Sequence, residues 1–183
     1  MPLRGLSERG FSINELMLTV AVAGTLMTIA VPVMGNVSES VKLNGATREI
    51  ERELQSARLK AVTSNRVLRV RLNCPAAGYY RTVEYLNTAA DAATNRCVQT
   101  AYPFPAADTD LLTLPNYDGP MRMLPRGATV TSQVLQFHPD GTSYQVIANV
   151  VTPINPSVTV TVTRNAKSKA ITINAAGKIQ LQQ

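Results

Sequence analysis

Few side chains of this sequence belong to the types that carry out catalysis. His138 is the only histidine, and Pro139 follows it, a setting typical of a turn or surface residue rather than of a catalytic triad. Asp108 and Asp110 lie in a stretch rich in Pro, Ala and Thr, where they could touch a cation but supply too few oxygen ligands for a site. The sequence holds no phosphate-binding loop, dinucleotide motif or HExxH pair. It therefore predicts no enzyme, no cofactor and no metal site.

Basic residues offer a second kind of chemistry, because contacts to phosphate groups need only positive charge. The formal net charge is +6, a weak indication of acidic partners. Arg66, Arg69 and Arg71 begin or line the outward face of one expected strand. A second group lies near the C-terminus and consists of Arg164, Lys167, Lys169 and Lys178. This second group could bind DNA, or it could be an ordinary solvated basic turn that helps solubility.

An apolar stretch from Leu16 to Met34 has 19 residues and no charge. A helix that rises about 1.5 Å per residue would be long enough to cross a hydrocarbon core of about 30 Å. Glu15 directly precedes the stretch, and a carboxylate is costly in lipid unless it has a partner or lies near the interface. Glu15 is therefore either the interfacial residue of an ordinary signal anchor or a group with a specific partner.

The residues before this stretch favour the specific partner. A secretory signal peptide carries its small-residue cleavage site after the apolar region, whereas Gly10 precedes the apolar region here and follows Arg9. The next residues read Phe11-Ser-Ile-Asn-Glu-Leu. This pattern resembles the signature of type IV pilins and type II secretion pseudopilins, which have a short basic leader, then Gly-Phe-Ser-x-x-Glu-Leu, and then an apolar helix.

The resemblance implies roles for individual residues. Residues 1–10 would be a leader that prepilin peptidase cuts between Gly10 and Phe11, and the new amino group of Phe11 would be methylated. Glu15 would neutralise the N-terminal amine of a neighbouring subunit in the filament, because a buried charge becomes tolerable when it is paired. Pro32 matches the helix-kinking proline of the family, since proline removes an i→i−4 hydrogen bond.

Residues 11–34 would then form a transmembrane and filament-core helix, and residues 35–64 continue the same helix in amphipathic form. Apolar residues at spacings of 3, 4, 4, 3 and 4 form one stripe, which consists of Leu43, Ala46, Ile50, Leu54, Ala57 and Ala61. Charged residues between them are expected to form the wet face. We expect one helix from about residue 11 to residue 63.

The sequence of residues 65–183 predicts a β-rich globular domain. Leu68, Val70 and Leu72 alternate with two arginines, as in a strand with one buried face. Prolines in residues 87–127 indicate a long variable loop with room for one short strand. The strands are expected at residues 66–72, 79–86, 128–138, 143–151, 158–163, 170–174 and 179–181. The expected fold is α+β and pilin-like, with the long helix packed on an antiparallel β-sheet.

The C-terminal half carries a second resemblance. The segments Leu135-Gln-Phe-His-Pro-Asp-Gly-Thr and Ile171-Thr-Ile-Asn-Ala-Ala-Gly-Lys-Ile resemble the GspH/FimT group of minor pilins and pseudopilins. Some members of this group bind DNA through a basic motif of the form Gly-Arg-x-Arg. The matching residues here are Gly177-Lys178-Ile179-Gln180, so lysine and glutamine replace the two arginines. This departure weakens the DNA-binding hypothesis.

Arg4 and Arg9 precede the apolar stretch, which favours a cytoplasmic N-terminus and an exported C-terminal domain. The resemblance implies a single-pass protein of the bacterial inner membrane, with its globular domain in the periplasm and in a filament after assembly. In an oxidising compartment Cys74 and Cys97 are expected to form a disulfide. Its loop of about two dozen residues would stabilise the fold by roughly 3 kcal/mol. Two free buried thiols are the alternative.

The predicted function is that of a minor pilin or pseudopilin, which moves out of the membrane and assembles into a type IV pilus or a type II secretion pseudopilus. Its partners would be prepilin peptidase, other pilins or pseudopilins, and the inner-membrane assembly platform. The first alternative is a DNA-binding minor pilin that acts in natural transformation. The second is a membrane-anchored periplasmic enzyme or sensor with an uncleaved N-terminus.

Overall fold

The structure is a computed structural model that describes residues 10, 12–93, 95–104 and 117–182, with the backbone alone for residues 29–33, 36 and 88. Several predictions fall outside the described residues. They concern the leader residues 1–9, the methylation site Phe11, the side chain of Pro32 and the loop carboxylates Asp108 and Asp110.

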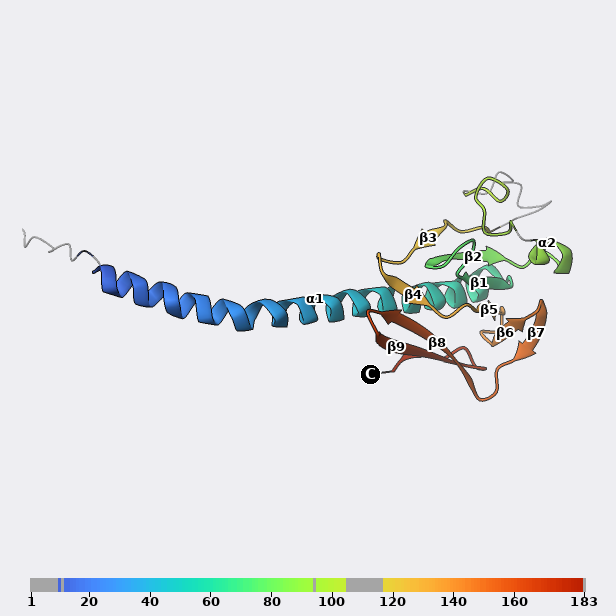
Figure 1. Cartoon of the computed structure of the whole chain (residues 1–183). Coiled ribbons are helices and arrows are strands. Elements are labelled where there is room, and N and C mark those ends of the chain that lie inside the picture. Colours follow the sequence, from blue (N-terminus) through green and yellow to red (C-terminus); the bar gives the residue numbers. More distant parts are fainter. Residues whose placement is uncertain (1–9, 11, 94, 105–116, 183) are drawn as a thin grey trace, which may run out of the picture. The chain divides into compact units, whose positions relative to one another are not determined.

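One long helix occupies the N-terminal third of the chain. α1 runs from Ile13 to Ser64, which confirms the single long helix that the sequence predicts. The chain divides into two compact units, Met1–Glu39 and Ser40–Gln183, and α1 contributes to both (Figure 1). Among the described residues, no helix combines the length and the apolar character needed to cross a membrane.

The part of α1 from Ser40 onward belongs to the globular domain and supplies its central apolar stripe. All six predicted stripe residues, from Leu43 to Ala61, are at most 3% exposed. They belong to one continuous core that also contains Leu68, Phe137 and Ile171 from the strands. The helical spacing of 3 and 4 residues therefore places one face of α1 against the strands, as predicted.

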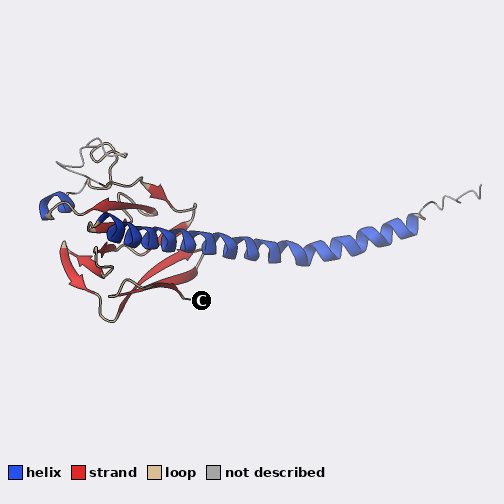
Figure 2. Ribbon diagram, turned by 180° about the vertical axis from the view of Figure 1, so that it is seen from behind, coloured by secondary structure: helices blue, strands red, loops and turns tan. Residues whose placement is uncertain are grey.

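The strands form two antiparallel sheets rather than the single sheet that the sequence analysis expected. The larger sheet has the strand order β3-β2-β1-β5-β6-β7, and the smaller has the order β10-β9-β8-β4. Figures 1 and 2 show the domain half of α1 running across both sheets. The strand bounds are β1 Leu68–Leu72, β2 Tyr79–Glu84, β3 Arg122–Met123, β4 Ala128–Val130, β5 Val134–Phe137, β6 Ser143–Ile147, β7 Val150–Pro153, β8 Ser157–Arg164, β9 Lys167–Asn174 and β10 Ile179–Leu181.

Two of the predicted strands are wrong in their extent. Residues 128–138 are not one strand, because β4 pairs with β8 in the smaller sheet whereas β5 pairs with β1 in the larger. Residues 143–151 are likewise divided, and Ala148 and Asn149 turn the chain from β6 into β7. Both turn residues have positive φ, as a two-residue hairpin turn requires.

The predicted long loop contains a short helix that the sequence analysis missed. α2 spans Thr88–Ala92, and the side chain of Asn87 caps it by accepting a hydrogen bond from the Ala90 N–H at 2.8 Å. The predicted short strand of this region is β3. Cys74, just after β1, forms a disulfide with Cys97, and their Cα atoms are 5.5 Å apart.

Candidate assembly and binding sites

The start of α1 is the first candidate site, because Gly10 and Glu15 lie there. The Ser12 hydroxyl accepts a hydrogen bond from the Glu15 N–H at 3.4 Å, and the Ser12 carbonyl accepts one from the Leu16 N–H at 3.1 Å. Ser12 is thus the N-cap, and it places Glu15 in the first helical turn, where a carboxylate interacts favourably with the helix dipole. Both Gly10 and Glu15 are exposed.

The apolar side chains that follow Glu15 are exposed as well. Between Leu16 and Met27, the large ones that are at least 49% exposed are Leu16, Met17, Leu18, Val20, Val22, Leu26 and Met27. Exposed apolar patches of this length mark surfaces that contact another protein or lipid. The arrangement therefore leaves a continuous apolar helix surface available for a partner from outside the chain.

The four basic residues predicted near the C-terminus do not form one cluster. Arg164 and Lys167 face each other across the turn between β8 and β9, and Lys169 lies two residues further along β9. Lys178 follows the opposite end of β9, which is eight residues long. At about 3.3 Å per residue, Lys178 is separated from Lys167 by roughly 20 Å or more along the strand. The structure thus separates Lys178 from the other three.

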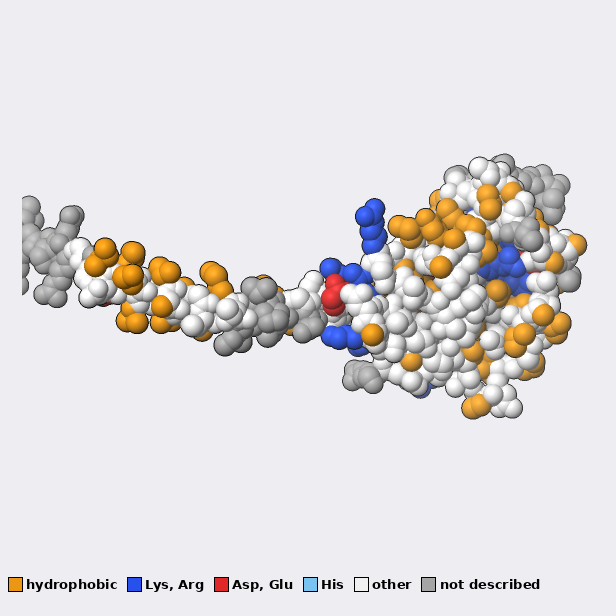
Figure 3. All heavy atoms as spheres, viewed as in Figure 1, with side chains coloured by type: hydrophobic (Ala, Val, Ile, Leu, Met, Phe, Trp, Pro, Cys, Tyr) orange, Lys and Arg blue, Asp and Glu red, His pale blue; other side chains and the backbone are white. Residues whose placement is uncertain are grey.

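A fourth cation joins the three at the β8–β9 turn. An Arg164 Nη1–H donates a hydrogen bond to the carbonyl of Arg126, and Arg126 is exposed. The Lys167 ammonium donates to the Ser40 hydroxyl at 3.4 Å. We refer to Arg126, Arg164, Lys167 and Lys169 together as the basic tip. In the view of Figure 3, Lys and Arg side chains lie together with Asp or Glu side chains at the end of the domain where α1 enters it.

Gly177, which belongs to the second family resemblance, has a structural role. Arg58 of α1 donates hydrogen bonds to the carbonyls of Gly141 at 3.0 Å and Ala176 at 3.2 Å. A Cβ added at Gly177 would come within 2.2 Å of the Gly141 carbonyl oxygen and 2.3 Å of Arg58 Nε. Gly177 also has φ +73°. We call this contact the Arg58 clip, and it joins turns of both sheets to the helix.

The prediction that Arg69 and Arg71 line an outward face is wrong. Arg69 is 2% exposed, and its Nη1 lies 3.3 Å from Asp91 Oδ2 of α2. Arg71 is partly buried and donates a hydrogen bond to the Asp91 carbonyl. α2 and the segment after it cover this face of the larger sheet, so these arginines cannot form an open binding surface.

Arg96 of the covering segment lies in the interior with two further charged residues, Asp118 and Arg81 of β2. Arg96 Nη2 lies 3.0 Å from Asp118 Oδ1, and Arg81 Nε donates to the Gly119 carbonyl at 2.7 Å. Both guanidinium groups are fully buried. Burial raises the pKa of Asp118, whereas the nearby Arg96 and Arg81 act to lower it. Buried ion pairs of this kind are weak evidence for stability. Removing one partner is nevertheless destabilising, because the other charge is then buried without a counter-charge.

The disulfide adjoins this charge cluster. Cys97 is fully buried and directly follows Arg96, so the disulfide fixes the chain at the point where Arg96 enters the interior. One local signal in the sequence indicates the helix of the covering segment. Asn87 before Thr-Ala-Ala-Asp-Ala is a good N-cap followed by helix-forming residues.

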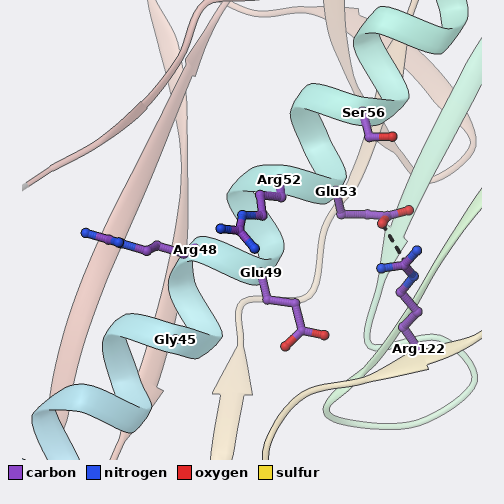
Figure 4. Close-up of a pocket in the computed structure, with 7 residues that line it drawn as sticks. All are labelled: Gly45, Arg48, Glu49, Arg52, Glu53, Ser56 and Arg122. Atoms are coloured by element: carbon purple, nitrogen blue, oxygen red, sulfur yellow. Dashed lines mark ion pairs between the residues drawn. The ribbon is translucent and has the colours of Figure 1, made fainter.

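A groove of about 460 Å³ lies between α1 and β3 (Figure 4). Its carboxylates serve the fold, since Glu49 accepts a hydrogen bond from Tyr80 Oη at 2.5 Å and Glu53 accepts one from Thr82 Oγ1 at 2.6 Å. Figure 4 shows Arg48 and Arg52 pointing away from these two carboxylates. Glu49 and Glu53, predicted on the wet face of α1, thus bind the larger sheet.

His138 lies at the end of β5, where its Nε2 is 2.6 Å from the Gln136 side-chain nitrogen and its ring contacts Tyr144. Burial lowers the pKa of His138. Asp140 in the following turn accepts two hydrogen bonds from Thr142, which lower the pKa of Asp140. Within the described residues, no group of three His, Cys, Asp or Glu side chains could hold a metal ion.

Comparison with known proteins gives distant structural likenesses. A crystal structure of the type IV minor pilin FimU of Pseudomonas aeruginosa PAO1 is 19% identical, with 80% of this chain and 92% of that chain covered and a TM-score of 0.48. The minor pseudopilin EpsH of the Vibrio cholerae type 2 secretion system is 11% identical, with coverages of 77% and 96% and a TM-score of 0.46. No curated protein matches the sequence.

The family described as type II transport protein GspH matches residues 46–177. The match begins in the domain half of α1 and ends at Gly177 of the Arg58 clip, so it contains both the apolar stripe from Ala46 onward and nearly all strands. Because this match covers well over half of the sequence, the chain belongs to the GspH family of type II transport proteins.

Proposed function

We propose that the chain is a minor pilin or pseudopilin whose role is structural: it is processed at its N-terminus and becomes a subunit of a filament. Family membership supports assembly with other pilins or pseudopilins. The observation that carries the proposal is the contrast within α1, which buries its stripe in the domain but exposes the large apolar residues between Leu16 and Met27. These exposed apolar side chains need to be covered by lipid or by other subunits.

In this proposal the precursor lies in the bacterial inner membrane through residues 11–34, with its domain in the periplasm. Prepilin peptidase cuts between Gly10 and Phe11, and Phe11 is then methylated. The exposure of Gly10 and its position before the first helical turn support access by a peptidase. In the filament, Glu15 pairs with the Phe11 amine of a neighbouring subunit, and the assembly platform drives the transfer from lipid.

The first experiment is mass spectrometry of the intact protein from membrane fractions. We expect a chain that begins at Phe11, with or without an added methyl group. A chain that begins at Met1 would contradict the processing proposal and would favour a signal-anchored periplasmic domain. Gly10→Leu is the matched variant, because a large side chain at the cleavage site should leave the precursor uncut while the domain folds normally.

The DNA-binding minor pilin remains an alternative proposal. Its support is the basic tip, since nonspecific contacts to phosphate need only positive charge. The placement of Lys178 beyond the other end of β9 removes it from this group. Retention of duplex DNA by the full chain at increasing salt tests the alternative, because binding through phosphate contacts must weaken as salt rises.

A further inference from the structure

The side chain of Gln136 connects His138 to the buried charge cluster of the larger sheet. Arg69 Nε–H donates a hydrogen bond to Gln136 Oε1 at 2.7 Å, and the Gln136 side-chain nitrogen lies 2.6 Å from His138 Nε2. On its other side, Arg69 places Nη1 3.3 Å from Asp91 Oδ2 of α2. These four residues form one chain of contacts from the end of β5 to α2, which we call the histidine relay.

The strands and the turn after β5 hold the relay in place. Gln136 of β5 pairs directly with Arg69 of β1 in the antiparallel register. Gln136 is 3% exposed and Arg69 is 2% exposed, so both side chains depend on partners within the protein. The His138 ring lies against the ring of Tyr144, with centroids 4.5 Å apart, and the His138 N–H donates to the Thr142 carbonyl. The imidazole therefore has a defined position beside the Gln136 amide.

Arg69 fixes the hydrogen-bond roles along the relay. A guanidinium group can only donate, so the Gln136 atom that faces Arg69 Nε is the amide oxygen. The amide nitrogen of Gln136 therefore faces His138, and this nitrogen also can only donate. His138 Nε2 must accept the bond, which it can do only without a proton. The relay is complete only while the imidazole is neutral.

Protonation of His138 at Nε2 places two donors opposite each other. The conflict is relieved when the Gln136 amide turns over, because its oxygen then accepts from the imidazolium. The same rotation turns the amide nitrogen toward Arg69 Nε–H, which loses its acceptor. A buried donor without a partner is costly, so the guanidinium reorients toward another acceptor and its contact with Asp91 weakens.

Charged and titratable groups face the relay from every element packed against it. They are Asp140 in the turn after β5, Tyr144 of β6, Arg71 of β1, Tyr85 after β2, Asp91 of α2 and Arg96 before the disulfide. Burial lowers the pKa of His138, Asp140 acts to raise it, and Arg69 acts to lower it. The folded chain therefore holds a neutral imidazole at neutral pH and binds the proton below the ordinary pKa of about 6.5.

We propose that the histidine relay is a pH-sensitive latch that holds α2 on the larger sheet at neutral pH and loosens it when His138 is protonated. Asp91 is the point of release, because Arg69 contacts its carboxylate and Arg71 donates to its carbonyl. Loosening of α2 uncovers these two arginines. The disulfide at Cys97 keeps the far end of the covering segment attached, so the opening is local. The latch lies within the globular unit and is independent of the processing and assembly proposed above.

The test uses the untagged full chain in detergent micelles, with the disulfide oxidised, and follows nuclear magnetic resonance signals as the pH is lowered through about 6.5. His138 is the only histidine of the sequence, so its ring signals give its pKa directly. The Nε–H signal of Arg69 reports the bond to Gln136, and the hydrogen-exchange protection of the Asp91 N–H reports α2. The Nε–H signal of Arg81, which is buried on the neighbouring strand β2, is the internal control.

We expect the Arg69 Nε–H signal to shift with the same midpoint as the His138 ring, while the Arg81 signal stays constant. The protection factor of the Asp91 N–H should fall by about tenfold or more through this midpoint, as expected when a hydrogen bond to a charged group is lost.

Two variants should move the midpoint in opposite directions. Asp140→Asn keeps an oxygen for the turn but removes the charge that favours the imidazolium, so the His138 and Arg69 midpoints should fall together. Gln136→Glu should raise the pKa of His138 above about 6.5, because a carboxylate favours the charged imidazole. A carboxylate also accepts from both neighbours, so protection of the Asp91 N–H should no longer follow His138.

A His138 ring that titrates while the Arg69 signal stays constant would overturn the latch, because the imidazolium would then have left the relay without turning Gln136. A shift of the Arg69 signal with unchanged protection of the Asp91 N–H would also overturn it, since α2 would not be released. Asp140 lies in an exposed turn, so Asp140→Asn keeps the proposal falsifiable if Gln136→Glu does not fold.

Discussion

The two parts of α1 have similar helical structure and opposite surroundings. Before Ser40 the large apolar side chains are exposed, for example Leu26 at 63%, whereas in the domain part Ile50 and Leu54 are fully buried. Backbone hydrogen bonds form in both parts, so helix formation alone does not distinguish them. The difference lies in the partner: the chain supplies its own sheets for the second part, whereas the large apolar side chains of the first part are exposed, and lipid or another subunit covers them in the proposed function.

The largest expected effect comes from Glu15→Ala, which tests the external partner. If Glu15 pairs with a neighbouring amine, the variant leaves that amine buried without a counter-charge, a loss of about 3–5 kcal/mol per contact. We expect membrane insertion and leader cleavage to persist while incorporation into filaments is lost, as measured by immunoblotting of sheared filaments. Glu53→Gln is the control, since Glu53 binds Thr82 within the domain. Unchanged incorporation of Glu15→Ala would refute the pairing.

Next in size is a matched pair of leucine substitutions. Leu54→Ala leaves a cavity in the core and should lower the free energy of unfolding by about 2–5 kcal/mol. Leu26→Ala removes an exposed side chain and should change that free energy by less than about 0.5 kcal/mol. Denaturant titration of the full chain in detergent, followed by circular dichroism, measures both. Equal destabilisation of the two variants would contradict the view that Leu54 is packed within the chain and Leu26 is not.

A pair of glycine substitutions should give a smaller effect and opposite signs. Gly177→Ala introduces a Cβ into the Arg58 clip and forces alanine to φ +73°, so we expect a loss of about 1–3 kcal/mol or more. Gly45→Ala should stabilise by about 0.5–1 kcal/mol, because nothing lies within 4 Å of the added Cβ and alanine favours the helix. Thermal unfolding of both variants distinguishes the signs. A stable Gly177→Ala protein would show that the clip is dispensable.

The smallest expected effect is a shallow dependence of domain stability on pH through His138. Because burial lowers the pKa of His138 in the folded state, the unfolded chain binds more protons just below its ordinary pKa of about 6.5. The free energy of unfolding should therefore fall as pH drops through about 6.5, and level off below the pKa of the folded state. His138→Gln should remove the dependence of the free energy of unfolding on pH in this range. Asp140, with a lowered pKa, contributes only at more acidic pH, below its ordinary value.

The sequence predicted the features that depend on neighbouring residues. The stripe from Leu43 to Ala61 is confirmed because a period of 3.6 residues is a local property of the chain. The turn at Asp140 and the last strand, β10, are confirmed for the same reason. The antiparallel pairing and the α+β class also followed from the order of helix and strand patterns.

The features that depend on distant residues were not predicted. Residues 128–138 have uniform β propensity, yet the Thr131 N–H donates to the Thr161 carbonyl and the Gln133 carbonyl accepts from Leu72, so the chain changes sheets between them. The alternation around Arg69 indicated a solvent-facing side, but Asp91 of α2 covers it. Of the basic residues near the C-terminus, position in sequence did not reveal that β9 separates Lys178 from the other three.

The Arg58 clip has a consequence for the order in which the chain can fold during synthesis. Arg58 bonds to Gly141 and Ala176, which follow it by 83 and 118 residues. A ribosome must therefore synthesise at least as far as Ala176 before both bonds of the clip can form. Until then Arg58 cannot join α1 to the turns of both sheets, so the clip closes late in the synthesis of the domain.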